Sequence, residues 1–155
     1  MRAASPLAET LAAAAIRRGA MRLLLDLDLA AIPEVTLPNG RRADLLALGA
    51  GGELTLVEIK SSREDFLTDR KWPDYLGFAD LFYFAVAPDF PLELLPDAEG
   101  IILADRFAGA IHRPARKRPV EPARRKSLLL RFARLGALRL HGAMDPEALA
   151  GRLDG

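Results

Sequence analysis

The stretch Arg41–Lys60, RRADLLALGAGGELTLVEIK, constrains this chain more than any other part of it. Apolar residues on both sides of the run GAGG predict two strands joined by a glycine-rich turn. Asp44, Glu58 and Lys60 interrupt this apolar hairpin. Charged side chains are rarely buried unless they are paired or bind a metal ion. The hairpin therefore predicts a functional site.

The length of the turn decides whether the two carboxylates share a face of the sheet. Side chains alternate along a strand, so Glu58 and Lys60 lie on one face. A three-residue loop places Asp44 opposite Glu58, whereas a two-residue turn places Asp44 opposite Val57. We adopt the first register because it makes one chemical site.

Asp44 and Glu58 are a candidate metal site. Two carboxylates held close together repel each other unless a cation lies between them. Mg²⁺ prefers one or two carboxylates, keeps several waters and binds phosphate oxygens; the Ile59 carbonyl is a further candidate ligand, and Mn²⁺ a possible substitute. Lys60 adds a compact charge that suits a negatively charged transition state. The set indicates metal-assisted hydrolysis of a phosphodiester, and we expect Lys60 to serve cleavage but not folding, with its ammonium reaching solvent or metal-bound water.

The spacing D-x13-E-x-K on a strand–turn–strand resembles the signature of the PD-(D/E)XK nuclease superfamily. The longer run VEIKSSREDFLTDRKWPDYLGFADLFYFAVAPDF is more specific. With GRRAD before it, and ADRFAGAIHRPA and ARRKSLLLRFARL after it, the chain resembles the MmcB family of bacterial DNA-repair proteins over roughly residues 5–140. The resemblance implies an α/β, restriction-endonuclease-like fold, with a mixed central sheet flanked by helices. It also implies a role in DNA repair.

Length and composition bound the organisation of the chain. With 155 residues, we expect a single domain over residues 1–155, with a basic loop and helix at 113–140. The absence of cysteine excludes disulfides, CxxC zinc sites and thiol nucleophiles, and fits a cytoplasmic, nucleoid-associated protein. No run approaches ~18 apolar residues, so no membrane segment is expected. The pattern carries no signal for an oligomeric state.

Charge is distributed unevenly along the chain. Residues 106–139 carry eleven lysines and arginines but only one acidic residue. Residues 1–105 carry ten lysines and arginines and seventeen acidic residues. A block this basic predicts a phosphate-binding surface, with a solvated helix face as the alternative. Beside a nuclease-like hairpin we favour DNA binding. The candidate DNA-binding residues are Arg42, Lys71, Trp72, Arg113, Arg116, Lys117, Arg118, Arg124, Arg125 and Lys126.

Two residues near the hairpin have alternative interpretations. Glu34 is either an additional acidic residue of the catalytic site or an ion-pair partner of Arg41 or Arg42. Trp72 either stacks on an exposed base or belongs to the core, and a single tryptophan more often belongs to the core.

Three further carboxylates favour structural roles. Asp65 and Asp69 fit a solvated helix face, with dipole help at the helix start, better than a site. Asp80 fits a structural cap, or a partner for a buried cation, better than a metal ligand.

The remaining elements follow from caps and hydrophobic patterns. Residues 21–32 are either a strand or a helix end, and a strand begins at Glu34. In the helix after Ser61 and Ser62, Phe66 and Leu67 should point inward. We expect helices over 6–18 (ended by Gly19), 63–70, 73–78, 123–140 and 147–153, strands over 81–87, 100–104 and 107–112, and a proline-rich loop over 113–122.

Three functions remain open from the sequence. The first is a metal-dependent DNA-repair nuclease, the second a non-catalytic DNA-binding module of the same fold, and the third a scaffold for a repair polymerase or other DNA-repair proteins. The intact set of Asp44, Glu58 and Lys60 favours the first, since a lost activity usually leaves one member replaced. The basic helix supports both DNA-binding functions and does little for the third.

Overall fold

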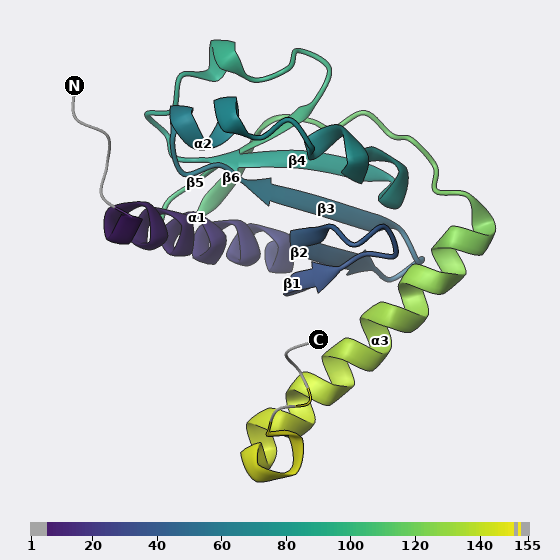
Figure 1. Ribbon diagram of the computed structural model, residues 1–155. Coiled ribbons are helices and arrows are strands. Elements are labelled where there is room, and N and C mark those ends of the chain that lie inside the picture. Colours follow the sequence, from purple (N-terminus) through teal and green to yellow (C-terminus); the bar gives the residue numbers. More distant parts are fainter. Residues whose placement is uncertain (1–5, 151, 153–155) are drawn as a thin grey trace. The chain divides into compact units, whose positions relative to one another are not determined.

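The computed structural model describes residues 6–150 and residue 152 (Figure 1). The chain divides into two compact units, one ending at Val120 and the other beginning at Glu121. The single-domain organisation expected from length stays a prediction. No helix within the described residues is both long enough and apolar enough to cross a membrane.

The first unit is built on one six-stranded mixed sheet, which confirms the mixed central sheet implied by the family resemblance. β3, β4 and β5 run parallel, and every other neighbouring pair is antiparallel. The strands lie in the order of the sequence: β1 (Leu29–Thr36), β2 (Arg42–Gly49), β3 (Leu54–Ile59), β4 (Leu81–Val86), β5 (Gly100–Ala104) and β6 (Gly109–Arg113).

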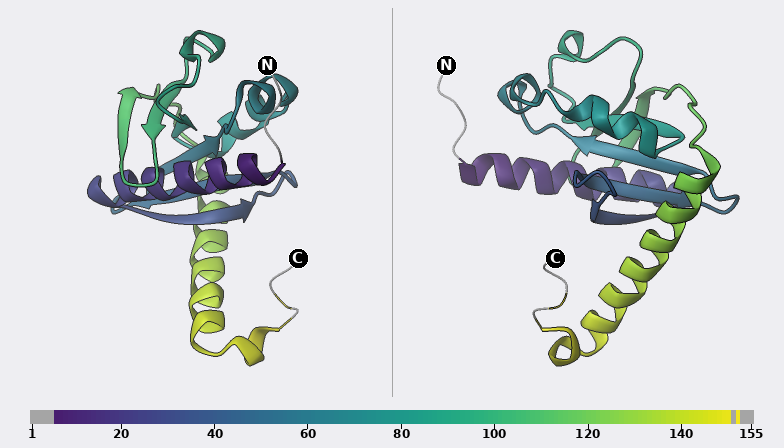
Figure 2. Two further views of the ribbon diagram at one scale, coloured as in Figure 1. Left: turned by 90° about the vertical axis from the view of Figure 1, so that its left-hand side faces the viewer. Right: turned by 45° about the vertical axis from the view of Figure 1, so that its right-hand side comes forward.

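Helix α1 (Pro6–Asp26) lies across one face of this sheet and contacts most of its strands (Figures 1 and 2). The prediction that Gly19 ends the helix is wrong. Gly19 lies inside α1, and the β5–β6 turn packs directly against it. A Cβ at this position would clash with the carbonyl oxygens of Asp105 and Ala108. Glycine is therefore required here by a long-range contact and not by a helix end.

The alternation of side chains along the strands gives the sheet two apolar faces, both covered by helices. Tyr83 and Ala85 of β4 join a buried cluster with Ile16, Ala20 and Leu24 of α1. The other face carries an aromatic cluster from β4, α2 (Arg63–Thr68) and the 3-10 helix η1 (Trp72–Phe78). Its rings lie 5.0–6.0 Å apart and belong to Phe66, Trp72, Phe82 and Phe84.

The structure places several helix and strand ends at other residues than the sequence predicted. Residues 21–32 contain both alternatives, because α1 continues to Asp26 and β1 begins at Leu29 instead of Glu34. Phe66 packs on Phe84 as expected, but Leu67 is 51% exposed, so its predicted inward direction is wrong. A helix as short as α2 presents only one side to the sheet, and Phe66 occupies it.

Asp80 has the structural role that the sequence favoured. It is 2% exposed and precedes β4. Its carboxylate accepts hydrogen bonds from the backbone N–H of Leu54 at 2.8 Å and of Val120 at 3.0 Å, and its carbonyl accepts one from the N–H of Arg118. These three partners are all backbone donors, as the cap interpretation requires. Asp80 ties the irregular segment after β6 to the start of β3.

The second unit contains the predicted basic helix. Helix α3 (Pro122–Met144) extends beyond both predicted ends. Glu121 caps it, since its carboxylate accepts from the N–H groups of Ala123 and Arg124 at 3.1 Å. The last predicted helix is a shorter 3-10 turn, η3 (Pro146–Leu149), and its predicted end at residue 153 lies outside the described residues. A further short turn, η2 (Leu92–Leu94), belongs to the first unit.

Candidate active site

The β2–β3 hairpin has the register that places the two carboxylates opposite each other. Leu45 pairs with Val57 and Leu48 with Leu54, so the next position along places Asp44 opposite Glu58. Gly52 adopts a φ of 91° in the loop, a conformation that glycine reaches without strain. The three-residue loop predicted from the glycine run is confirmed.

The two carboxylates replace the backbone ladder where β2 and β3 stop pairing. The N–H of Asp44 donates to Oε1 of Glu58 at 3.0 Å, and the N–H of Ile59 donates to Oδ2 of Asp44 at 2.7 Å. Each bond occupies one oxygen of a carboxylate that has two. Both side chains are thus held in place by the backbone of the opposite strand.

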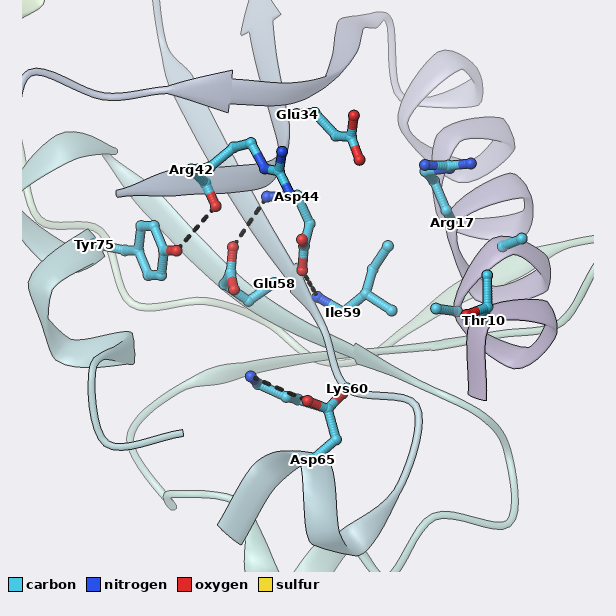
Figure 3. A pocket seen from close by; sticks show the side chains of 12 residues that line it. Thr10, Arg17, Glu34, Arg42, Asp44, Glu58, Ile59, Lys60, Asp65 and Tyr75 are labelled. Atoms are coloured by element: carbon cyan, nitrogen blue, oxygen red, sulfur yellow. Dashed lines mark hydrogen bonds and ion pairs between the residues drawn. The ribbon is translucent and has the colours of Figure 1, made fainter. Parts of the chain in front are cut away.

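A pocket of about 530 Å³ opens at this point, and Figure 3 shows the side chains around it. Its size is typical of a ligand site. Asp44, Glu58 and Lys60 all line it, so the structure brings the three predicted residues together. The other residues of the lining are Thr10, Ala13, Ala14, Arg17, Glu34, Arg42, Ile59, Asp65 and Tyr75.

Burial dominates the electrostatics of the carboxylate pair. Loss of hydration, followed by the nearby charge of Asp44, raises the pKa of Glu58 to about 9. Burial also raises the pKa of Asp44, against a smaller lowering by the N–H of Ile59. Without a cation, Glu58 therefore retains at neutral pH a proton that an exposed carboxylate would have lost. A divalent ion bound here has to displace this proton.

Lys60 lies in the pocket wall. We expected its ammonium to reach solvent, but it does not. Its side chain is 6% exposed, and Nζ donates to Oδ2 of Asp69 at 2.6 Å, with Asp65 4.0 Å away. Burial acts to raise the pKa of Asp69, but hydrogen bonds from Lys60 and from the backbone of Lys71 and Trp72 outweigh it, so the pKa is lowered.

The expected solvated face is therefore wrong for Asp69, whereas Asp65 lies in the first turn of α2 with its side chain 38% exposed, in line with the expectation. Asp65 accepts from the N–H of Ser61 at 2.9 Å, and its own N–H donates to Oγ of Ser62 at 3.1 Å. These bonds fix the start of α2. Asp65 then lines the pocket, and Asp69 holds the ammonium of Lys60.

Glu34 lies in the pocket lining in a strained backbone conformation. Its φ is 53°, in the left-handed region that few residues other than glycine adopt. The pairs on either side of it, Pro33 with Leu45 and Val35 with Ala43, place it opposite Asp44. Arg41, one of its expected ion-pair partners, instead contacts Asp74 at 3.2 Å. Strain of this kind is often retained where a side chain is needed at a site.

Replacing Glu34 by glycine should separate strain from function. Glu34→Gly removes a conformational cost of about 1 kcal/mol, so we expect a melting temperature at or above that of the wild type. Glu34→Gln keeps the Cβ and removes only the charge, so it should melt close to the wild type. Both variants should weaken divalent-metal binding, measured by calorimetry. A melting temperature for Glu34→Gly below that of Glu34→Gln would contradict the strain.

Sequence reasoning missed the part of the pocket that α1 and η1 supply. Thr10 and Arg17 come from α1, and in Figure 3 Arg17 lies across the pocket from Asp44. Tyr75 of η1 donates its hydroxyl proton to the carbonyl of Arg42 at 2.9 Å, and burial raises its pKa. The spacing of residues 10, 13, 14 and 17 was an available signal, because it is one face of a helix.

The structure gives several predicted DNA-binding residues structural partners. Trp72 stacks on Phe82 and meets Phe84 edge-to-face, which agrees with the core interpretation. Arg113 donates to the carbonyls of Glu99 and Pro96 at 2.7 and 2.6 Å, and Arg118 makes two bonds to the Glu99 carboxylate. DNA binding by these residues stays a prediction.

The other predicted DNA-binding residues lie in different parts of the chain. Arg42 is in the pocket lining, and Lys117 contacts Glu53 at 3.1 Å. Lys71 and Arg116 are exposed in the first unit. The helix α3 carries Arg124, Arg125 and Lys126.

The fold and pocket define a mixed α/β protein with an acidic pocket at the end of a β-hairpin. A family model described as DNA repair protein MmcB-like matches residues 3–147. The chain belongs to this family of DNA repair proteins. A solved structure, the SPO1766 protein of unknown function from Silicibacter pomeroyi, is 39% identical with a TM-score of 0.84, and the match covers 87% of this chain and 92% of that one. Among curated proteins, none matches this chain.

Proposed function

We propose that this protein is a metal-dependent DNA-repair nuclease with a PD-(D/E)XK-type, restriction-endonuclease-like core. The observation that carries the proposal is the placement of Asp44 opposite Glu58, in one pocket with Lys60. Membership of a DNA-repair family supports DNA as the ligand. The reaction would be hydrolysis of a phosphodiester bond.

The residues of the pocket fit Mg²⁺ or Mn²⁺. Within residues 6–150 and 152, no group of three or more acidic or histidine side chains forms a metal cage. Mg²⁺ usually binds one or two carboxylates and fills its remaining positions with water and substrate phosphate. Asp44 and Glu58 would hold the ion, and the Ile59 carbonyl is a further candidate ligand. When bound, the ion would supply charge neutralisation and an activated water.

The side chains around the carboxylates would orient the substrate and its charge. The N–H of Ile59 and the N–H of Asp44 hold the two carboxylates before the ion arrives, which reduces the reorganisation that binding costs. Asp69 holds the ammonium of Lys60 in one position. The positive charge of Lys60 would therefore already be in place when negative charge builds up on the phosphate in the transition state.

The first experiment is a calorimetric titration with Mg²⁺ and Mn²⁺. The wild type should bind one of these ions, and Asp44→Ala should not. Lys60→Met keeps the length of the aliphatic stem and should bind metal, because Lys60 supplies no ligand. Glu64→Gln, an exposed position on α2, is the control. Equal metal affinities for Asp44→Ala and the wild type would remove the basis of the proposal.

The second experiment tests cleavage on labelled flap, nicked, gapped, mismatched and single-stranded DNA with Mn²⁺. Lys60→Met should cut about 10²–10³-fold more slowly than the wild type, because it lacks one stabiliser of the transition state. Wild-type DNA binding without cleavage of any substrate would favour the binding module over the nuclease.

The basic helix α3 supports DNA binding by a separate observation. A shallow groove of about 570 Å³ runs along it, and Lys126, Arg131 and Arg134 lie among Leu130, Leu135 and Leu138 in its lining. Cations beside an apolar strip suit a phosphate backbone. This observation also fits the non-catalytic DNA-binding module.

The salt dependence of DNA binding should follow the charge of α3. Each phosphate that a cation neutralises steepens the fall of log K with log salt concentration by ~0.9. Lys126 and Arg134 are both exposed. Replacing both with glutamate should therefore flatten the slope by about twice this amount. Fluorescence anisotropy at several salt concentrations measures the slope. Reversing Arg70, an exposed arginine of the first unit, is the matched control. Unchanged slopes in the double variant would mean that α3 is only a solvated surface.

A further inference from the structure

A second hollow meets the candidate active site along α1. Its volume is about 540 Å³, and all but one of the residues that line it come from α1, with Ala31 of β1 completing it. Ala14 and Arg17 line both this hollow and the active-site pocket. The two hollows therefore meet at these side chains. We call the second one the α1 groove.

The floor of the α1 groove is apolar. Met21 and Ala31 are half-buried and pack against the core beneath α1. Leu25, at the far end of the groove, is 73% exposed. Exposed apolar surface that is rimmed by polar residues commonly marks a binding site. The groove therefore offers apolar contact for a ligand.

The rim of the α1 groove is cationic. Arg17, Arg18 and Arg22 line it, and none of its described lining residues is acidic. Nη1 of Arg22 donates to the carbonyl of Phe107 at 2.8 Å, which orients the guanidinium. The groove thus combines fixed positive charge with apolar surface. Asp26 and Asp28, both exposed, follow its far end, so the positive field stops there.

We propose that the α1 groove binds a single-stranded extension of a DNA substrate whose scissile phosphodiester lies in the active-site pocket. This deepens the proposed function and rests on it for the position of the scissile bond. Phosphates of the extension contact Arg18 and Arg22, and its bases pack on Met21 and Leu25. Grooves for single-stranded nucleic acid combine these two kinds of contact, a basic rim and a surface for the bases.

Two observations favour nucleic acid over a partner protein. The groove meets the pocket at Arg17, so one chain of phosphates can follow both. Its charge is of one sign, which complements a phosphate backbone along its whole length. From Ala14 to Leu25 the helix rises about 17 Å. At about 3.4 Å per stacked nucleotide, this is room for about five nucleotides.

The test compares labelled duplexes with blunt ends and with five-nucleotide 5′ or 3′ extensions. Binding is measured by fluorescence anisotropy in EDTA, so no strand is cut. The wild type should bind one extended duplex about tenfold more tightly than the blunt one, and the 5′ and 3′ arms report the polarity. Arg18→Glu and Leu25→Asp change residues that line the groove but not the pocket. Each should remove most of this preference and leave blunt-duplex affinity within about twofold.

Arg70→Glu is the matched control for charge, because Arg70 is exposed and lines neither hollow. It should keep the preference for the extension. Equal affinity of the wild type for blunt and extended duplexes would overturn the proposal, and so would Arg18→Glu with an undiminished preference. Either result would leave a protein partner as the occupant to test next.

Failure of this inference is distinguishable from failure of the proposed function. The preference for an extension is measured without metal or cleavage, whereas the nuclease proposal depends on metal binding by Asp44 and on cutting. A protein that cuts DNA but does not prefer extensions retains the first proposal and loses the second. A protein that prefers extensions but binds no metal retains the α1 groove as a site for single-stranded DNA and loses the nuclease proposal. Its α1 groove would then belong to a binding module.

Discussion

Glu58→Gln should unfold at a higher temperature than the wild type at pH 8 without divalent ions, and it should lose metal-dependent cleavage. Burial and the charge of Asp44 raise the pKa of Glu58 from 4.5 to about 9. Between these values the folded protein holds a proton that the unfolded chain has lost. The free energy of unfolding therefore falls as pH rises through this window, with a limiting slope of about 1.4 kcal/mol per pH unit.

Glutamine removes this ionisation. Its Oε1 can still accept the N–H of Asp44, which lies 3.0 Å away in the wild type. The limiting slope from pH 4.5 to pH 8 sets an upper bound of about 5 kcal/mol on the gain, and relaxation of the site around the charged form lowers the gain that we expect at pH 8 to about 2 kcal/mol, equivalent to about 4–8 °C. We expect little change at pH 4.5, where Glu58 in the folded wild type is as neutral as the glutamine. Cleavage should fall by at least ~10²-fold because Glu58 is a proposed metal ligand.

Thermal unfolding from pH 4.5 to pH 9, with and without Mg²⁺, measures both effects. Mg²⁺ should raise the melting temperature of the wild type most at high pH, where the carboxylates release protons easily, and should not stabilise Glu58→Gln. The control is Glu64→Gln, which should keep the pH profile of the wild type. A wild-type profile that rises through this window, or a Glu58→Gln profile identical to it, would contradict the assignment.

Asp80→Ala should be the most destabilising single substitution among those considered for this chain. The carboxylate of Asp80 satisfies two backbone donors, the N–H groups of Leu54 and Val120, at a position that is 2% exposed. Removing it leaves both donors buried without this acceptor, at about 1–3 kcal/mol each. We expect a loss of about 3–5 kcal/mol, a large share of the stability of a typical domain.

Urea denaturation followed by circular dichroism measures this loss as a lower midpoint. Asp80→Asn keeps one acceptor oxygen and should fall between Asp80→Ala and the wild type. Asp89→Ala, an exposed turn residue, should shift the free energy of unfolding by no more than about 0.5 kcal/mol. A loss below about 1 kcal/mol for Asp80→Ala would mean that water replaces the carboxylate at both donors.

The local part of the candidate site could be predicted from the sequence. The alternation of side chains along a strand and the length of a glycine turn are properties of neighbouring residues. They limited Asp44 to a position opposite either Glu58 or Val57, and the structure has the first of these registers. The apolar run of β4 likewise predicted a strand with two covered faces, because its residues leave no polar side for solvent.

Interactions between distant segments were not accessible in this way. Gly19 looked like a helix end, although the close approach of a turn more than eighty residues later requires it. Asp69 looked solvated until the position of α2 brought it to the ammonium of Lys60. The helical spacing of residues 10, 13, 14 and 17 puts Arg17 on one face of α1, but only the packing of α1 on the sheet brings that face to the pocket.

The sequence by itself determined the chemistry of the pocket, since the hairpin carries both carboxylates and the lysine within twenty residues. Only the tertiary structure decided what surrounds them. The packing of α1 and η1 supplies Arg17 and Tyr75, and the strained Glu34 lies opposite Asp44. The physical reason is that strand alternation and turn length act over a few residues, whereas burial, raised pKa values and strain arise only when elements pack together.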